Sequence, residues 1–391
     1  MSDSSPKNQW PVALRDSKPP EMQSGTTAAL ESPHKTDLRD TKDFRYECAA
    51  KIYEKILYID GTYRLTAIHV SIILLAPLSS LTDGGSLDHT TRGALRLLLA
   101  LENAATLVGH FLRSSNEDRR QSVCQTQPKG PVDAHPSERY PKTSITSMAS
   151  SHETPDNDDT EPGGSSTEPE VIQRSTAAKN DCLERDNFKC LFTCAPAGEV
   201  AYILPFSWNK SEHYCLQTRY PLIRSMQVFF NDESTSVLAI TLCNPARLDG
   251  SDQYRNMITM NDDLCSLWPQ AFFGLKCLGI RPLDTQNAKV EIQFNWLKRR
   301  IGKPTDKIAI IGSNSIQEMA KEQICYEDNN NPAPEIYILV NSGHVVTLIM
   351  PIDDAKICKV IIDLQWHLIQ IAAMSGGAEH PELLPKSEIR Y

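Results

Sequence analysis

Two stretches of the sequence hold side chains whose types and spacing could do chemistry at a shared site. The first, residues 199–207, reads as an apolar strand that carries the phenol of Tyr202. The second, residues 255–268, places Asn256 in a loop and Cys265 on a short helix that Asn261 or Asp262 would cap. A phenol with an ordinary pKa of about 10 is a weak proton acceptor at neutral pH. A cysteine thiolate suits Zn²⁺ better than Mg²⁺.

The order of these elements resembles the HNH nuclease module found in many fungal proteins. Two further blocks carry the likeness: residues 185–193, an Arg-Asp pair followed by an aromatic, a Cys and a Thr, and the amphipathic stretch 363–375. The family has His at the positions of Tyr202 and Cys265, so only Asn256 remains of the three name-giving residues. Cys194 stands where the family usually has Gly, and Pro269 where an Asp often follows the helix His. The resemblance covers roughly residues 174–380.

What the resemblance implies is a ββα-metal core that cuts a phosphodiester with one divalent ion. In the family, the strand His accepts a proton from the attacking water, the helix His helps to hold the ion, and the Asn fixes the loop. With Tyr202 as a poor base and Cys265 as a poor Mg²⁺ ligand, we expect a degenerate endonuclease with weak or no cleavage. Such a protein would retain nucleic-acid or protein binding and need no cofactor.

Two alternatives stay open at this point. One is an active metal-dependent HNH endonuclease that uses an altered site with Mg²⁺ or another divalent ion. The other is a structural-zinc or protein-interaction module, since Cys190 and Cys194 have an acceptable half-site spacing for Zn²⁺. Cys215, Cys243 or Cys265 would complete that zinc site.

A local basic cluster is the candidate for nucleic-acid contact. Lys298, Arg299 and Arg300 follow Trp296, which predicts phosphate contacts beside an aromatic side chain for base stacking. Arg255 is a second candidate for phosphate contact because it neighbours Asn256. A solvated surface patch is the competing interpretation. DNA or RNA and a protein are therefore the expected partners, and the sequence leaves the oligomeric state open.

Composition limits the class of protein. The net charge of −9 excludes a polycation that binds nucleic acid by bulk electrostatics. Eleven irregularly spaced cysteines without a signal peptide favour free thiols in a reducing compartment, so we expect an intracellular protein, cytoplasmic or nuclear, that is not secreted. The most apolar run, residues 65–81, is interrupted by His69 and Pro77 and predicts a buried helix, with no membrane partner.

The fold class that these patterns predict is α+β, with an HNH-type ββα-metal core inside a larger mixed domain. We expect a disordered tail (1–42), a helical module (43–115), an acidic low-complexity linker (116–172), an HNH-like domain (173–300) and a C-terminal part packed on it (301–391). Helices are predicted from Phe44 to a stop near Asp60, from Tyr63 to Ala76, and from about Thr90 to Arg113.

The HNH-like and C-terminal parts are predicted to hold further strands. An opening β-hairpin should pair residues 188–193 with a strand at Val200–Leu204, and strands should cover 274–280 and 290–296. A hairpin of residues 335–340 with 344–349 turns at Asn341-Ser342-Gly343. An amphipathic helix then covers 363–375 and stops at Gly376.

Overall fold

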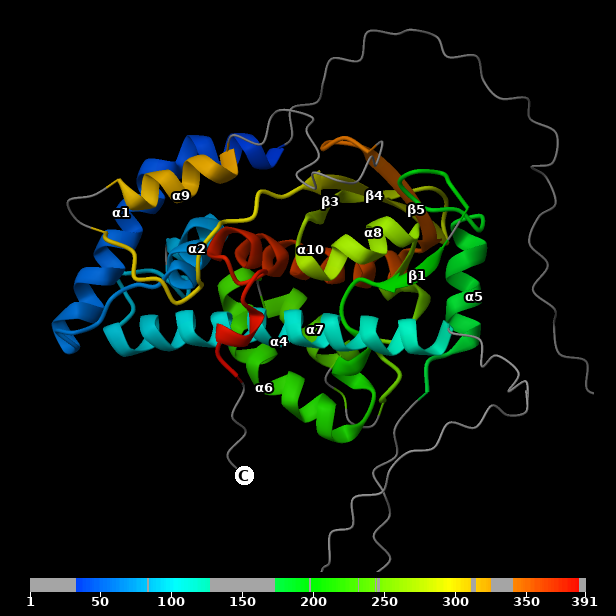
Figure 1. Cartoon of the computed structure of the whole chain (residues 1–391), viewed down its shortest axis with the longest axis horizontal. Coiled ribbons are helices and arrows are strands. Elements are labelled where there is room, and N and C mark those ends of the chain that lie inside the picture. Colours follow the sequence, from blue (N-terminus) through cyan, green and yellow to red (C-terminus); the bar gives the residue numbers. More distant parts are fainter. Residues whose placement is uncertain are drawn as a thin grey trace, which may run out of the picture.

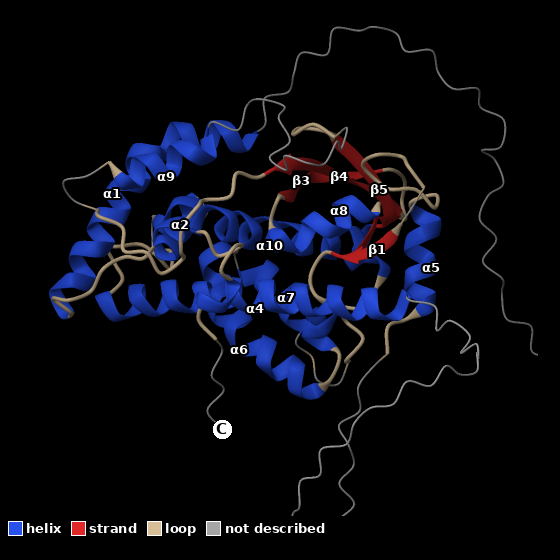
Figure 2. Cartoon of the chain, in the orientation of Figure 1, coloured by secondary structure: helices blue, strands red, loops and turns tan. Residues whose placement is uncertain are grey.

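The computed structural model describes residues 33–82, 84–126, 173–196, 198–230, 232–242, 244, 247–310, 314–324 and 340–386. Ten α-helices lie in these ranges: α1 Pro33–Ile59, α2 Ala67–Leu75, α3 Leu78–Leu81, α4 Ala94–Thr126, α5 Thr176–Arg185, α6 Glu212–Phe229, α7 Asp232–Leu242, α8 Asp262–Leu267, α9 Ser315–Ile324 and α10 Ile352–Ser375. Five strands accompany them: β1 Glu199–Tyr202, β2 Met257–Met260, β3 Phe273–Pro282, β4 Asn287–Trp296 and β5 Val345–Pro351. The predicted α+β class is confirmed (Figure 2).

The strands of the described residues form two small antiparallel sheets. β1 pairs with β2 so that Tyr202 lies opposite Met257 and Glu199 opposite Met260. The second sheet has the order β3-β4-β5. Its β3–β4 hairpin is the strand pair that the sequence predicted between residues 274 and 296.

Helix α10 is the centre of the fold. It packs against β3 and β4 on one side and against α2, α4 and α7 on the other, and Figure 1 shows it running through the middle of the molecule above α4. The close approach to β3 depends on Gly274, because a Cβ there would lie 2.8 Å from the Trp366 ring and from Ile369. Buried side chains of the N-terminal helices, both sheets and α10 belong to one contiguous core.

The N-terminal helices follow the predicted boundaries in part. α1 ends at Ile59, one residue before the predicted stop, and every residue of α2 is buried, as expected for the apolar run. α2 begins at Ala67 and not at Tyr63, because residues 60–65 form a turn and an extended segment before the Thr66 N-cap. α4 continues to Thr126, past the predicted end at Arg113 and into the predicted linker. Residues 127–172 of that linker lie outside the described residues.

Two helices among the described residues, Ala94–Arg120 of α4 and Ile352–Ser375 of α10, are long and apolar enough to cross a membrane by length and composition. Most of the apolar window of α10 and half of that of α4 are buried inside the protein. A core helix passes the same test: α10 packs against the three-stranded sheet, and α4 packs against α10, α6, α1 and α2.

The predicted opening hairpin is wrong in its pairing. Residues 188–193 form turns, with only one bridge between Lys189 and Pro196, and β1 pairs with β2 instead. The backbone explains the difference, since Asn187, Phe188 and Cys194 have φ of 55–57°, a left-handed conformation that cannot continue a strand. Leu191 N donates to Thr259 O, so this segment bonds to β2 from its outer edge.

The C-terminal segments differ from prediction in two ways. The first arm of the expected hairpin at 335–340 lies almost wholly outside the described residues, and the second arm is β5, which pairs with β4. Gly343 N donates to Phe294 O, so the predicted turn lies against the end of β4. α10 begins at Ile352, eleven residues earlier than predicted, with Pro351 as its N-cap.

Candidate functional site

The two stretches with chemical side chains come together as a strand pair followed by a helix. β1 and β2 are antiparallel, and α8 follows β2 directly, with Asn261 as its N-cap accepting a hydrogen bond of 3.1 Å from Leu264 N. The predicted cap and the predicted end of the helix at Pro269 are confirmed. α8 packs against β1, so Cys265 and Tyr202 face the same region.

Asn256 ties the loop before β2 to the end of β1. It is fully buried, and its Nδ2 donates to Leu204 O at 2.9 Å and to Ser251 O at 2.8 Å. Leu204 N donates in turn to Asn256 Oδ1 at 2.9 Å. These bonds take the place of strand pairing at Leu204, so β1 ends at Tyr202 and not at the predicted Leu204.

Arg185 and Asp186 hold β2 from the side of α5. The Arg185 guanidinium donates to Asp186 at 2.7 Å and 2.9 Å and to the carbonyls of Tyr254 and Met257 at 2.9 Å and 2.7 Å. Asp186 also accepts bonds of 2.9 Å from both the backbone N and the hydroxyl of Thr259. The sequence singled out this pair only as part of the resemblance, and its place in the structure is a buried anchor for the strand.

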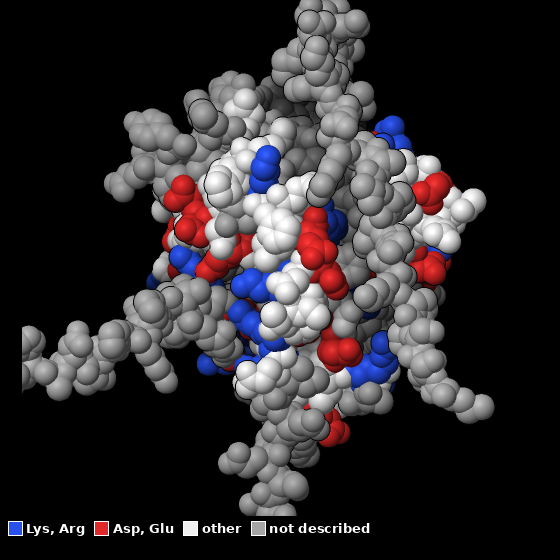
Figure 3. Space-filling model, turned by 90° about the vertical axis from the view of Figure 1, so that its right-hand side faces the viewer, with Lys and Arg blue, Asp and Glu red and all other residues white. Residues whose placement is uncertain are grey.

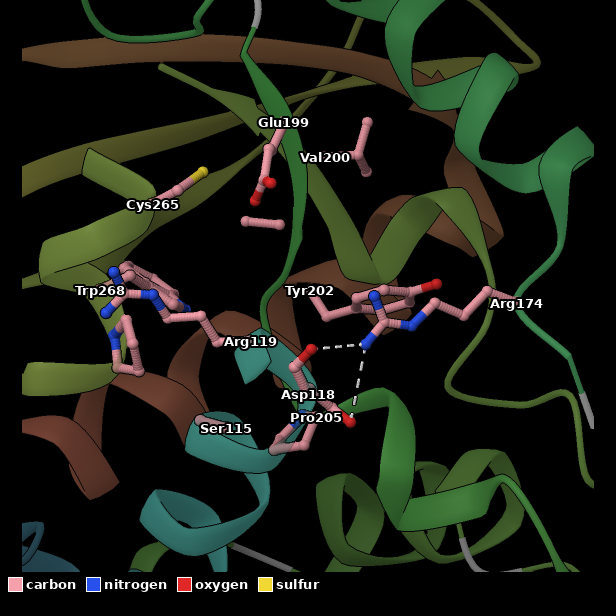
Figure 4. Close-up of a pocket in the computed structure, with 12 residues that line it drawn as sticks. Ser115, Asp118, Arg119, Arg174, Glu199, Val200, Tyr202, Pro205, Cys265 and Trp268 are labelled. Carbon is pink, nitrogen blue, oxygen red and sulfur yellow. Dashed lines mark hydrogen bonds and ion pairs between the residues drawn. The ribbon is translucent and has the colours of Figure 1, made fainter. Parts of the chain in front are cut away.

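A small pocket lies where β1, α8 and the C-terminal half of α4 meet (Figure 4). Its volume is about 60 Å³. A cavity of about 15 Å³ by this measure holds one water molecule. The pocket therefore has room for a few water molecules or one small polyatomic ion. The lining comes from four segments: Ser115, Asp118 and Arg119 of α4, Arg174 before α5, residues 199–202 and Pro205 around β1, and Cys265, Trp268 and Pro269 around α8.

Tyr202 is a hydrogen-bond donor in this pocket. Its hydroxyl donates to Asp252 Oδ1 at 2.8 Å, and its ring packs on Phe206 with centroids 5.6 Å apart. Burial, reinforced by the charge of Asp252, raises the pKa of the Tyr202 phenol far above its ordinary value. The phenol therefore stays protonated and cannot accept a proton from water at neutral pH.

Cys265 is a neutral thiol. Burial raises the pKa of its thiol strongly, and the nearby carboxylates of Glu199 and Asp262 raise it further. Only the thiolate is an effective metal ligand or nucleophile. Cys265 is thus a small, half-buried residue of α8 with a neutral thiol.

Asp118 and Arg174 are pocket residues that the sequence reasoning missed. Asp118 lies inside the predicted linker, where residues 114–122 are all polar or charged, so no apolar period marked the continuation of α4. Its Oδ2 accepts a bond of 3.2 Å from Ser207 N, and Arg174 donates to its carbonyl at 2.8 Å and lies 3.9 Å from its Oδ1. Burial raises the pKa of the Asp118 carboxyl to about 6, against the opposing effects of Ser207 and Arg174.

Arg174 is held over two aromatic rings. Its guanidinium carbon lies 5.4 Å from the ring centroids of both Tyr202 and Phe206, within the range of cation–π attraction. Arg119 enters the pocket from α4, where its Nη1 donates to Ser266 O at 3.0 Å. Within the described ranges, no carboxylate is at ion-pair distance from Arg119.

The residues predicted to contact nucleic acid do not form one patch. Arg255 pairs with Asp354 at 2.8 Å near the start of α10, whereas Arg300 N donates to Ala373 O near its end. The nineteen residues between those two α10 positions span about 28 Å of helix.

The basic cluster itself is partly engaged inside the protein. Arg299 pairs with Glu379 and lies 4.0 Å over the Phe272 ring, and Arg300 pairs with Asp306 at 3.2 Å. Lys298 is exposed. Its role in nucleic-acid contact, like that of Arg255, Arg299 and Arg300, stays a prediction.

The residues present do not fit a metal ion at this site. In the part of the chain that the structure describes, no group of three His, Cys, Asp or Glu side chains could hold one. Cys190 is buried and Cys194 exposed, so the expected zinc half-site is not assembled in these ranges. The eight cysteines whose side chains the structure describes are free, as the sequence predicted.

The surface around the α5 end of the molecule carries charges of both signs. Figure 3 shows Lys and Arg side chains interspersed with Asp and Glu on this face. Ligand binding on this face would therefore depend on individual residues and not on a broad field of one sign.

Comparisons with known proteins add no relative. No protein-family model, no curated protein and no solved structure matches the chain.

Proposed function

We propose that the protein is a degenerate HNH nuclease-like protein that has lost metal-dependent phosphodiester cleavage and acts by binding. Its β1–loop–β2–α8 unit is the ββα frame that the sequence resemblance implies. The frame is proposed to present a binding pocket in place of an ion.

One observation carries the proposal: Tyr202 and Cys265, at the positions of the two family histidines, line the same pocket. Asn256, at the position of the family Asn, joins the loop before β2 to the end of β1. The proximity of Tyr202 to Cys265, which lies 63 positions later in the sequence, supports the proposal. The resemblance was drawn from sequence order alone, so this placement is independent support.

Loss of catalysis follows from the chemistry of the two substituted positions. Tyr202 is a protonated donor to Asp252, and Cys265 is a neutral thiol. A missing general base costs on the order of 10² to 10⁴ in rate. Without an ion, the charge stabilisation of the pentacovalent phosphate is missing as well.

The test is a cleavage assay with plasmid and single-stranded DNA in Mg²⁺ or Mn²⁺. We expect no cleavage by the purified wild type and partial recovery in the double variant Tyr202→His with Cys265→His. The single variants Tyr202→Phe and Cys265→Ala serve as controls, because each removes the hydroxyl or thiol at its position and adds no base or ligand. Wild-type cleavage that either control removes would overturn the proposal in favour of an active enzyme with an altered site.

A further inference from the structure

The pocket carries an arrangement of cations that the lost metal chemistry does not explain. Arg119 comes from α4 and Arg174 from the segment before α5, and both line the pocket, Arg119 near Trp268 and Arg174 near Asp118 (Figure 4). Each guanidinium group donates a hydrogen bond to a backbone carbonyl. Arg119 donates to Ser266 O at 3.0 Å, and Arg174 donates to Asp118 O at 2.8 Å. Two guanidinium groups are therefore pre-positioned at one cavity, so little conformational entropy is lost when they bind a ligand.

The neighbouring groups leave part of this positive charge available. Asp118 lies 3.9 Å from Arg174 and offsets its charge, whereas Arg119 has no carboxylate at ion-pair distance in the described ranges. Cys265 adds a neutral thiol. Glu199 is the one pocket carboxylate for which the described residues show no bonded partner, and its negative charge opposes anion binding.

We propose that this pocket binds one phosphate group without a metal ion, through Arg119 with the support of Arg174. The volume of about 60 Å³ suits a single tetrahedral anion. Guanidinium groups match the geometry of phosphate oxygens, and charge-assisted bonds of this kind are stronger than neutral ones. The arginines would replace the missing cation as a fixed positive charge. They would bind the phosphate but would not activate water.

The source of the phosphate is either a nucleic-acid backbone or a small phosphorylated molecule. The backbone is the source favoured here, and that choice rests on the proposed function. The phosphate site itself rests on the pocket geometry, so the two are tested separately.

The first experiment measures thermal unfolding of the full chain in inorganic phosphate and in chloride at equal ionic strength, with EDTA present. Phosphate stabilises proteins in general, so the informative quantity is the difference between variants. We expect Arg119→Gln to lose the phosphate-specific rise in Tm, with binding weakened by about tenfold. Glu199→Gln should enlarge the rise, because it removes a repelling charge.

Arg120→Gln is the matched control, since it makes the same charge change at an exposed neighbour on α4 that does not line the pocket. It should retain the wild-type rise. Equal phosphate-specific rises in the wild type and Arg119→Gln, or equal losses in Arg119→Gln and Arg120→Gln, would overturn the site.

The second experiment identifies the source by fluorescence anisotropy of a labelled single-stranded oligonucleotide in EDTA at low salt. Backbone binding predicts that free phosphate displaces the oligonucleotide and that Arg119→Gln weakens binding more than Arg120→Gln does. Phosphate binding with no oligonucleotide binding would overturn the backbone source. Metal-dependent cleavage is read in the separate assay above, so failure of this inference and failure of the proposed function give different results.

Discussion

Tyr202 illustrates how a single position combines a predictable part and an unpredictable part. The sequence predicted a poor base at Tyr202 on an apolar strand, and the ring packs on Phe206. The hydroxyl bond to Asp252, fifty residues away, was not expected, because the loop that brings Asp252 to β1 has no local signal. In that bond the Tyr202 hydroxyl is the donor, so Tyr202 cannot act as a general base.

Asp118 gives the site a pH dependence that can be measured. Its folded pKa of about 6 lies above the ordinary value of 3.8. The folded state therefore binds the proton more tightly than the unfolded chain, and the burial cost of the charge is fully present above pH 6. As the pH falls from 6 toward 4, this cost is relieved, so Asp118 favours stability at the lower pH.

We expect Asp118→Asn to remove this dependence, because the amide has the size of the carboxyl and does not ionise. The free energy of unfolding of the variant, relative to wild type, should be higher at about pH 7.5 than at about pH 4.5 by roughly 2 kcal/mol. Denaturant titrations at both pH values measure it. Asp181→Asn, at an exposed position of α5, is the control, and a similar pH-dependent difference in that variant would contradict the assignment.

At the scale of elements, the contact between β3 and α10 decides how closely the sheet approaches the central helix. Gly274 lies in the middle of that contact, facing the Trp366 ring and Ile369. The sequence pattern identifies both elements, but a glycine in a strand does not reveal what approaches it.

Gly274→Ala should destabilise the protein by about 1–3 kcal/mol, because the added methyl would lie 2.8 Å from a rigid ring and must push β3 away from α10. Chemical denaturation measures the change. Gly61→Ala is the matched control, since an added Cβ there meets nothing within 4 Å, and it should change stability by less than about 0.5 kcal/mol. Equal effects of the two substitutions would show that the β3–α10 contact tolerates the methyl.

At the scale of the whole molecule, the described parts of the predicted helical module, HNH-like domain and C-terminal part share one core. Trp208 of η1 (Phe206–Asn209) packs on His110 and Phe111 of α4, and α10 joins α4 to β3. The division of this core into separate folding units stays a prediction from the sequence.

A shared core predicts one cooperative unfolding transition. Tryptophan fluorescence reports on buried Trp268, Trp296 and Trp366 around the sheet and on Trp208 against α4. It should have the same midpoint in denaturant as far-UV circular dichroism, which is dominated by the helices. Leu101→Ala creates a cavity beside α4 and should lower both midpoints together. A shift in the circular-dichroism midpoint alone would indicate that the N-terminal helices unfold separately.

The sequence by itself determined the local features of this protein. Four predictions are confirmed: the stop of α1, the Asn261 cap, the strands β3 and β4, and the free thiols. Each depends on residues within a few positions or on composition. The tertiary structure alone decided which distant groups meet: the pairing of β1 with β2, the bonds of Tyr202 and Asn256, and the entry of Asp118 and Arg119 from α4 into the pocket. The physical reason is that contacts between distant segments depend on packing free energy summed over the whole core, which no short stretch of sequence encodes.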